Sequence, residues 1–92
     1  MPTLHVRDVE KALKAHGFVQ RDRGDRIFVL WVNGKKQPIV TKTSQGAKEI
    51  WGGRINDMAG QVGLTKAEFL SFVYGEMDLP QYLAILRGKG LI

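Results

Sequence analysis

The residues best suited to chemistry in this sequence are cationic, and they are concentrated in one third of the chain. Between positions 21 and 54 the chain carries eight of its 14 lysines and arginines and only three carboxylates, so this third holds the whole formal net charge of +5. A localised positive field attracts polyanions, of which nucleic acid is the commonest. A solvated basic face, or one that meets an acidic protein, is the alternative. The residues predicted to bind nucleic acid are these eight cations, Arg21, Arg23, Arg26, Lys35, Lys36, Lys42, Lys48 and Arg54.

Other kinds of site have little support. The chain has no cysteine, and its two histidines, His5 and His16, fall at opposite ends of the first predicted helix. Because no cluster of carboxylates offers ligand spacing either, we expect no metal site and no cofactor. His16 lies in the last turn of that helix, where an imidazolium is stabilised by the helix dipole, so we expect a structural role for it rather than catalysis.

The elements that position the cations follow from the hydrophobic pattern. Apolar residues recur at helical spacing over residues 6–16, with Arg7, Glu10, Lys11 and Lys14 predicted to face solvent and Gly17 expected as the C-terminal cap. Residues 18–43 then predict a three-stranded antiparallel meander. Its first turn is centred on Gly24, and its second, at Asn33-Gly34, has the sequence of a type I′ hairpin turn. Because Pro38 cannot donate to a ladder, we expect it at the start of the last strand or on a sheet edge.

The remaining residues predict helices. A loop follows the meander and is expected to be anchored by Ile50 and Trp51. Helical spacing then extends over 54–87, with a capping box at Thr65 and Glu68 and a cap at Asp78. Leu79 and Tyr82 are among the apolar positions of the last helix. The chain therefore reads as a single α+β domain over 1–92. No apolar run approaches the length of a membrane span and no signal peptide is evident, so we expect a cytoplasmic protein with no membrane partner.

The order of these elements and their residues resembles a known family. The stretch from Leu13 to Phe18 ends a helix in Leu-x-x-x-Gly-Phe, a glycine leads into the central strand, a hairpin follows, and then comes a helix pair beginning "GLTKAEFL". In this order the sequence resembles the HicA toxins of bacterial and archaeal toxin–antitoxin pairs, over nearly the whole chain. The last helix, with Tyr82, is similar to that of the longer members.

The resemblance implies a fold, an activity and a partner. The fold is a double-stranded-RNA-binding-domain-like α-β-β-β-α two-layer sandwich, with additional C-terminal helices. The activity is metal-independent cleavage of mRNA by an endoribonuclease, and the partner is a HicB-like antitoxin protein that covers the active face. Such a nuclease needs a base near the ribose 2′-hydroxyl and a group that stabilises the charged phosphorane.

The sequence departs from the family at the residue that the family credits with this work. In HicA toxins a histidine begins the central strand, whereas here the matching residue is Arg26. Arginine stays protonated, so Arg26 can stabilise negative charge but cannot accept a proton. Three alternatives stay open: the domain binds RNA without cutting it, Arg26 is an inactivating change, or Asp25 is the base, with Arg26 and Lys42 as electrophiles. A module that binds only an antitoxin or another protein is the competing function.

Overall fold

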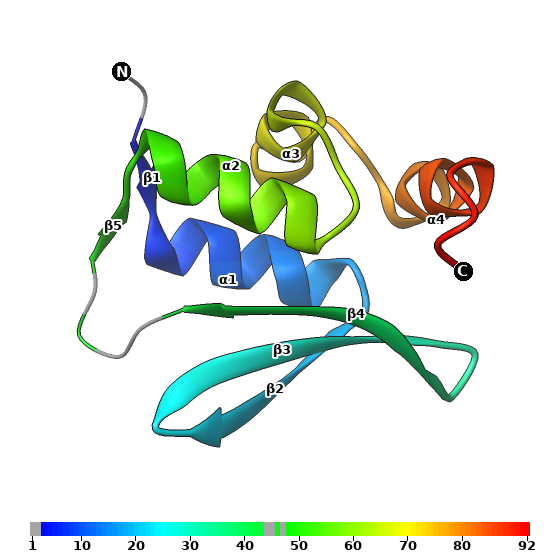
Figure 1. The fold of residues 1–92 in the computed structure, drawn as a ribbon, viewed down its shortest axis with the longest axis horizontal. Coiled ribbons are helices and arrows are strands. Elements are labelled where there is room, and N and C mark those ends of the chain that lie inside the picture. The colour runs from blue at the N-terminus through cyan, green and yellow to red at the C-terminus, as the bar shows by residue number, and fades with distance from the viewer. Residues whose placement is uncertain (1–2, 44–45, 47) are drawn as a thin grey trace.

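The computed structural model describes residues 3–43, 46 and 48–92, and it has an α+β fold (Figure 1). Figure 1 shows α1 (Val6–Ala15) and α2 (Gly52–Gln61) on one side of a three-stranded antiparallel sheet, with α3 (Lys66–Val73) packed on them and α4 (Leu79–Gly88) at one end. The radius of gyration is 12.2 Å, close to the ~12 Å expected for a compact domain of this length. The predicted α+β class is therefore confirmed.

α1 forms because its apolar residues recur on one side of the helix. Val6, Val9, Ala12 and Leu13 are buried, and the helix ends at His16. Gly17 follows with a φ of +86°, and a Cβ on it would lie 3.2 Å from the carbonyl oxygen of Trp31. Only glycine accepts both the left-handed φ and this close approach. The predicted helix and its glycine cap are confirmed to within one residue.

The sheet is the predicted meander. Its strands β2 (Phe18–Arg23), β3 (Asp25–Val32) and β4 (Lys35–Thr43) are neighbours in chain order, with β3 in the centre. Asn33 and Gly34 have φ of 52° and 77°, as a type I′ turn requires. β4 is an edge strand, which is where Pro38 was expected.

The two faces of the sheet differ in what covers them. Phe28 and Leu30 of β3 are fully buried in the core beneath the helices. Val29 points to the other face, where it is paired with Val19 of β2 and Val40 of β4. In β4, Ile39 and Thr41 are buried while Val40 and Lys42 are exposed, so the predicted alternation is confirmed. We call the side away from the helices, which carries Val19, Val29 and Val40, the open face.

A short ladder ties the start of the chain to the segment before α2. β1 (Leu4–His5) pairs antiparallel with β5 (Glu49–Ile50), and the backbone N–H of Val6 donates to the carbonyl of Lys48 at 3.0 Å. This ladder was not predicted from the sequence. Of the two residues expected to anchor the loop, Ile50 is buried, whereas Trp51 is 64% exposed, so the prediction is wrong for Trp51. Trp51 caps α2 instead, and its side chain makes no capping hydrogen bond.

The C-terminal helices begin where the caps predicted. Both α3 and α4 open with a complete capping box, Thr65 with Glu68 and Asp78 with Gln81. The helical part begins at Gly52 and ends at Gly88, slightly wider than the predicted 54–87. Leu79, predicted to be an apolar core position, is 37% exposed because it occupies the first turn of α4.

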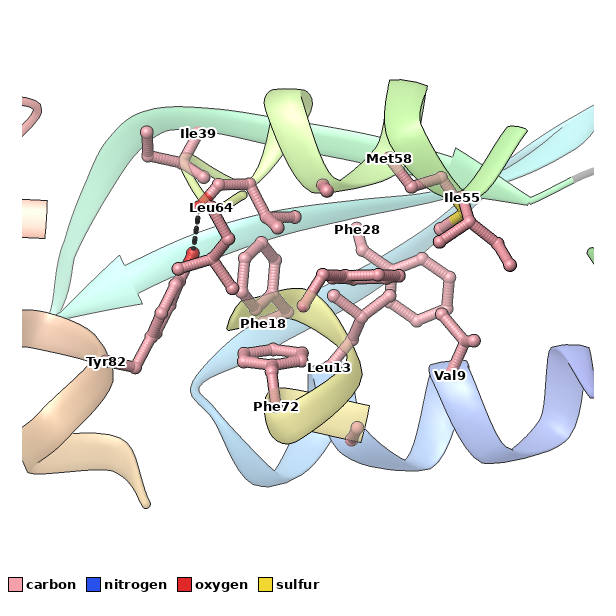
Figure 2. Close-up of a cluster of buried hydrophobic side chains, with 14 of the residues drawn as sticks. Val9, Leu13, Phe18, Phe28, Ile39, Ile55, Met58, Leu64, Phe72 and Tyr82 are labelled. Carbon is pink, nitrogen blue, oxygen red and sulfur yellow. Dashed lines mark hydrogen bonds between the residues drawn. The ribbon is translucent and has the colours of Figure 1, made fainter. Parts of the chain in front are cut away.

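Aromatic rings join β2, α3 and α4 into one core. Phe18, Phe72 and Tyr82 lie together in Figure 2, with ring centroids 5.0 to 6.4 Å apart. The Tyr82 hydroxyl donates to the carbonyl of Val62 at 2.8 Å, which satisfies its polar end (Figure 2). Burial raises the pKa of Tyr82 above its ordinary value of 10.0, so this hydroxyl remains a donor. The core therefore fixes α4 against the rest of the fold.

Candidate nucleic-acid interface

Arg26 is the second residue of β3 and lies on the side that faces the helices, at the rim of the core. Its Nη1 donates to both carboxylate oxygens of Glu10 in α1, at 2.9 and 3.1 Å. The Thr43 hydroxyl donates to the same carboxylate at 2.7 Å. The Arg26 side chain is 40% exposed and that of Glu10 only 12%. Glu10, predicted to face solvent, is instead mostly covered, and it orients the guanidinium.

Arg26 and Glu10 lie in a pocket of about 370 Å³ at the N-terminal end of α1. The pocket is within the size range of ligand sites, ~300–1,000 Å³. Its lining combines three cationic side chains, one histidine and the single carboxylate that Arg26 already engages. The lining residues are His5, Val6, Arg7, Glu10, Arg26 and Lys48. Since the cations outnumber the carboxylate, this pocket suits an anion such as a phosphodiester. We call it the cationic pocket.

The side chains of Asp25 and Arg26 lie on opposite faces of the sheet. Successive side chains of a strand point to opposite faces, so Asp25 lies on the open face while Arg26 points toward α1. There, an Asp25 carboxylate oxygen lies 3.6 Å from the Lys42 ammonium, and both side chains are about half exposed. The structure thus brings Asp25 to Lys42 and Arg26 to Glu10, in two separate pairs.

The other predicted cations are spread over several surfaces. Arg21 pairs with Ile27 and Lys36 with Trp31 across the open face, so both flank its valines, as Lys42 does. Lys35 lies at the β3–β4 turn, where it lines a pocket with Arg87 of α4. Lys48 alone joins Arg26 in the cationic pocket.

Two predicted cations remain. The Nη2 of Arg54 in α2 lies 3.5 Å from the carbonyl of Lys42, so it stands beside the end of β4. The side chain of Arg23 lies outside what the structure describes. The predicted cations therefore do not form one continuous rim: those that the structure describes divide between the open face, the hairpin turn, the cationic pocket and the first turn of α2.

Trp31 lies at the hairpin end of the sheet. The sequence alone did not decide which face of the sheet it occupies. It lies opposite Lys36 in the ladder and is partly buried. Its indole nitrogen is buried and, within the described part of the chain, donates to no acceptor. Trp31 is thus partly covered, with its indole nitrogen buried.

His16 has a structural role, as predicted. It is buried, its Nδ1 lies 2.6 Å from the carbonyl of Ala12, and its Nε2 lies 2.6 Å from the carbonyl of Met77. Both ring nitrogens therefore lie within hydrogen-bonding distance of a backbone carbonyl. The ring also stacks on Phe72 at 3.9 Å. His16 therefore fastens the end of α1 to the segment before α4.

Three residues of the cationic pocket were not predicted as site residues from the sequence: His5, Arg7 and Glu10. Arg7 and Glu10 were assigned to the solvent side of the first helix, and His5 was considered only as a metal ligand. A signal existed for Glu10, since a carboxylate in the second turn of α1 reaches the strand that carries Arg26. No signal existed for His5, because its place depends on the β1–β5 ladder.

Comparison with known protein families, curated proteins and solved structures finds no match for this chain. Among the residues that the structure describes, no three His, Asp or Glu side chains gather in a way that could hold a metal ion. No described helix is long and apolar enough to cross a membrane.

Proposed function

We propose that this chain is an RNA-binding, toxin-like domain of the HicA type that acts on mRNA in the cytoplasm. The order α1-β2-β3-β4-α2 supports this, because it is the order of a double-stranded-RNA-binding-domain-like sandwich, with α3 and α4 as the additional helices. The observation that carries the proposal is the cationic pocket, where Arg7, Arg26 and Lys48 surround a space lined by one carboxylate. Phosphate contacts dominate RNA affinity, and these side chains supply them.

Arg26 has an electrostatic part in this proposal. Glu10 holds its guanidinium in place, and the remaining donors of the group are aimed at anions from a fixed position. A preorganised cation of this kind stabilises the charge of a phosphorane without needing to accept a proton. If the domain cuts RNA, we propose that it does so as a metal-independent endoribonuclease.

The proposal is tested by binding labelled mRNA in EDTA over a range of salt concentrations. We expect affinity to fall steeply with salt, and the change of Arg7 and Lys48 of the cationic pocket together to glutamine to reduce the salt slope by about 1 to 2. The matched control changes Lys11 and Lys14, which lie outside the cationic pocket, and leaves the slope unchanged. Binding that is absent, or independent of salt, contradicts the proposal.

Arg26→His tests the link to cleavage. It restores the residue type that HicA toxins carry at this position and keeps Glu10 as a nearby carboxylate that can orient the imidazole. We expect the variant to cut the same mRNA in EDTA at least as fast as the wild-type chain. A variant that binds RNA but leaves it intact would mean that the scaffold does not present a substrate to position 26.

A second function, binding of an acidic HicB-like antitoxin, is favoured by the open face. Val19 and Val40 are 46% and 44% exposed on either side of Val29. Arg21, Lys36 and Lys42 surround them, so the surface combines an apolar centre with a basic margin. Protein interfaces have this composition, with the charge selecting an acidic partner.

The antitoxin is tested by calorimetry with an acidic HicB-like protein. Changing Val19 and Val40 to serine is expected to weaken this complex at least tenfold while leaving RNA affinity within about twofold. Tyr74→Ser, which removes an exposed aromatic on another surface, is the control and leaves both unchanged. Equal loss of RNA and protein binding would place both ligands on the open face.

A further inference from the structure

The cationic pocket has electrophiles but, among the residues predicted from sequence, no proton acceptor. Arg7, Arg26 and Lys48 are cations, and Val6 has no ionisable group. Asp25, the candidate base, lies on the open face beside Lys42. Only Glu10 and His5 in the pocket lining can accept a proton.

Glu10 is already committed. Its carboxylate accepts hydrogen bonds from Arg26 and from Thr43, and its side chain is only 12% exposed. His5 is different: it is exposed, and no hydrogen bond engages its ring within the described part of the chain. An imidazole that is open to solvent and next to cations is the group in this pocket that is free to take up a proton.

We infer that His5 is the general base of the cationic pocket, taking the 2′-hydroxyl proton of a bound ribonucleotide while Arg26 and Lys48 stabilise the charge that develops on the phosphate. The inference rests on the proposed RNA-directed function, and it names the residue that does the work Arg26 cannot do. His5 lies in the N-terminal segment, far in the sequence from Arg26 near the start of the central strand.

The backbone holds His5 in regular structure. His5 is the N-cap residue of α1, with extended φ and ψ of −76° and 134°, and it pairs with Glu49 in the β1–β5 ladder. The next residue, Val6, donates its N–H to the carbonyl of Lys48 at 3.0 Å. His5 and Lys48 are therefore held beside each other on adjacent segments, as a base and an electrophile of one site must be.

The step balances without a co-reactant. The neutral imidazole of His5 accepts the 2′-hydroxyl proton as the 2′-oxygen forms a bond to the adjacent phosphorus. The bond between phosphorus and the 5′-oxygen breaks, and that oxygen takes a proton from solvent. The products are a 2′,3′-cyclic phosphate and a 5′-hydroxyl end, so no metal ion or nucleotide cofactor is consumed.

The test compares the wild-type chain with His5→Ala on labelled mRNA in EDTA, measuring binding and cleavage separately. We expect His5→Ala to cut about 10² to 10⁴-fold more slowly, to bind RNA nearly as well, and to recover cleavage when free imidazole is added. Lys14→Ala, an exposed change at the other end of α1, is the control and cuts at the wild-type rate.

The other outcomes of this experiment contradict either the role of His5 or the binding of RNA. A His5→Ala chain that cuts within about threefold of wild type, well short of the usual loss of a general base, removes His5 from the mechanism. Slow cleavage that imidazole does not restore makes His5 a positioning residue and ends its role as base. A wild-type chain that binds RNA without cutting it overturns the inference and leaves the binding proposal standing. A chain that does not bind RNA overturns both.

A second measurement follows His5 without RNA. The chain has two histidines, so the two imidazole rings give separate proton signals in NMR. Titration with inorganic phosphate is expected to shift the His5 signals and leave those of His16 in place, because His16 is buried at the opposite end of α1. Phosphate that shifts neither ring, or both equally, contradicts an anion site beside His5.

Discussion

The two ends of α1 carry one histidine each, and their surroundings are opposite. At the N-terminal end His5 is exposed beside Arg7, Arg26 and Lys48. At the C-terminal end His16 is buried, and both ring nitrogens meet backbone carbonyls. We call the second region, with Phe72 and Tyr82 around His16, the closed end.

The difference shows how a residue type acquires a role. A buried histidine whose two nitrogens both meet backbone carbonyls contributes to stability through those hydrogen bonds. A histidine with free nitrogens among cations contributes little to stability and is available for chemistry. Mutations at the closed end should therefore change the free energy of unfolding, and mutations at the cationic pocket should change RNA binding or cleavage.

The largest effect is expected from Phe72→Ala at the closed end. Phe72 is fully buried, stacks on His16 and lies edge-on to Tyr82, with centroids 3.9 and 5.0 Å away. Removing its ring costs its transfer energy and leaves a cavity, about 3–5 kcal/mol. Urea denaturation measures the loss. Tyr74→Ala, which removes an exposed ring from the next turn, should change stability by less than about 0.5 kcal/mol.

Alanine at each histidine tests the comparison directly. His16→Ala leaves the carbonyl of Met77 without its donor and removes the stack on Phe72, so we expect a loss of about 2–4 kcal/mol. His5→Ala removes an exposed side chain and should cost less than about 0.5 kcal/mol. Thermal and urea unfolding of the two variants gives both numbers. Equal costs would mean that His5 is as much a part of the core as His16, and the contrast would fail.

The closed end was more predictable from sequence than the cationic pocket. Thr65, Asp78 and the glycine after α1 are capping residues, and each caps its helix through contacts within a few residues of the chain. Phe72 and Tyr82 could be placed in the core because burial follows from helical spacing. Leu79 shows the limit of that rule, since the first turn of a helix can project beyond the surface it packs on.

The cationic pocket depends on contacts between segments far apart in the chain. Arg26 and Glu10 are 16 residues apart and Thr43 and Glu10 are 33 apart, so no local pattern predicts that they meet. β1 and β5 have two residues each, too few to show an alternation, and their pairing is what brings His5 to Lys48. The excess of cations was evident from composition, but the division of these cations among separate surfaces depends on strand register and on where β5 and α2 pack.

Glu10→Gln sharpens the comparison because the two readouts should move in opposite directions. The change removes the carboxylate that receives Arg26 and Thr43, and we expect a loss of stability of about 1–2 kcal/mol for this partly buried site. It also removes the one carboxylate among the described residues that line the cationic pocket, so RNA should bind several-fold tighter at low salt. Urea denaturation and a salt titration of RNA affinity measure the two effects. Weaker RNA binding would mean that Arg26 needs Glu10 to hold its orientation.

The smallest effect on stability is expected at Glu68. This residue of α3 forms an ion pair with Lys89 at the end of α4. The Lys89 ammonium donates to Glu68 Oε1 at 2.8 Å, and the backbone N–H of Thr65 donates to the same oxygen at 2.8 Å. These donors hold the pKa of Glu68 below its ordinary value of 4.5. A lowered carboxyl pKa gives stability that is present above pH 4.5 and is lost as the pH falls through the folded value. Because the pair is partly exposed, solvent screens it, and we expect less than about 1 kcal/mol.

Glu68→Gln should therefore be slightly less stable than wild type at neutral pH, and the difference should vanish in acid. Urea midpoints between pH 2 and pH 7 measure it, with Glu76→Gln, an exposed carboxylate between α3 and α4, as the control. A small effect here beside a large one for Phe72→Ala would mean that buried rings, not surface ions, hold α4 in place. A loss at Glu68 as large as that at Phe72 would make the attachment of α4 ionic. The closed end would then loosen in acid, and its contrast with the cationic pocket would hold only near neutral pH.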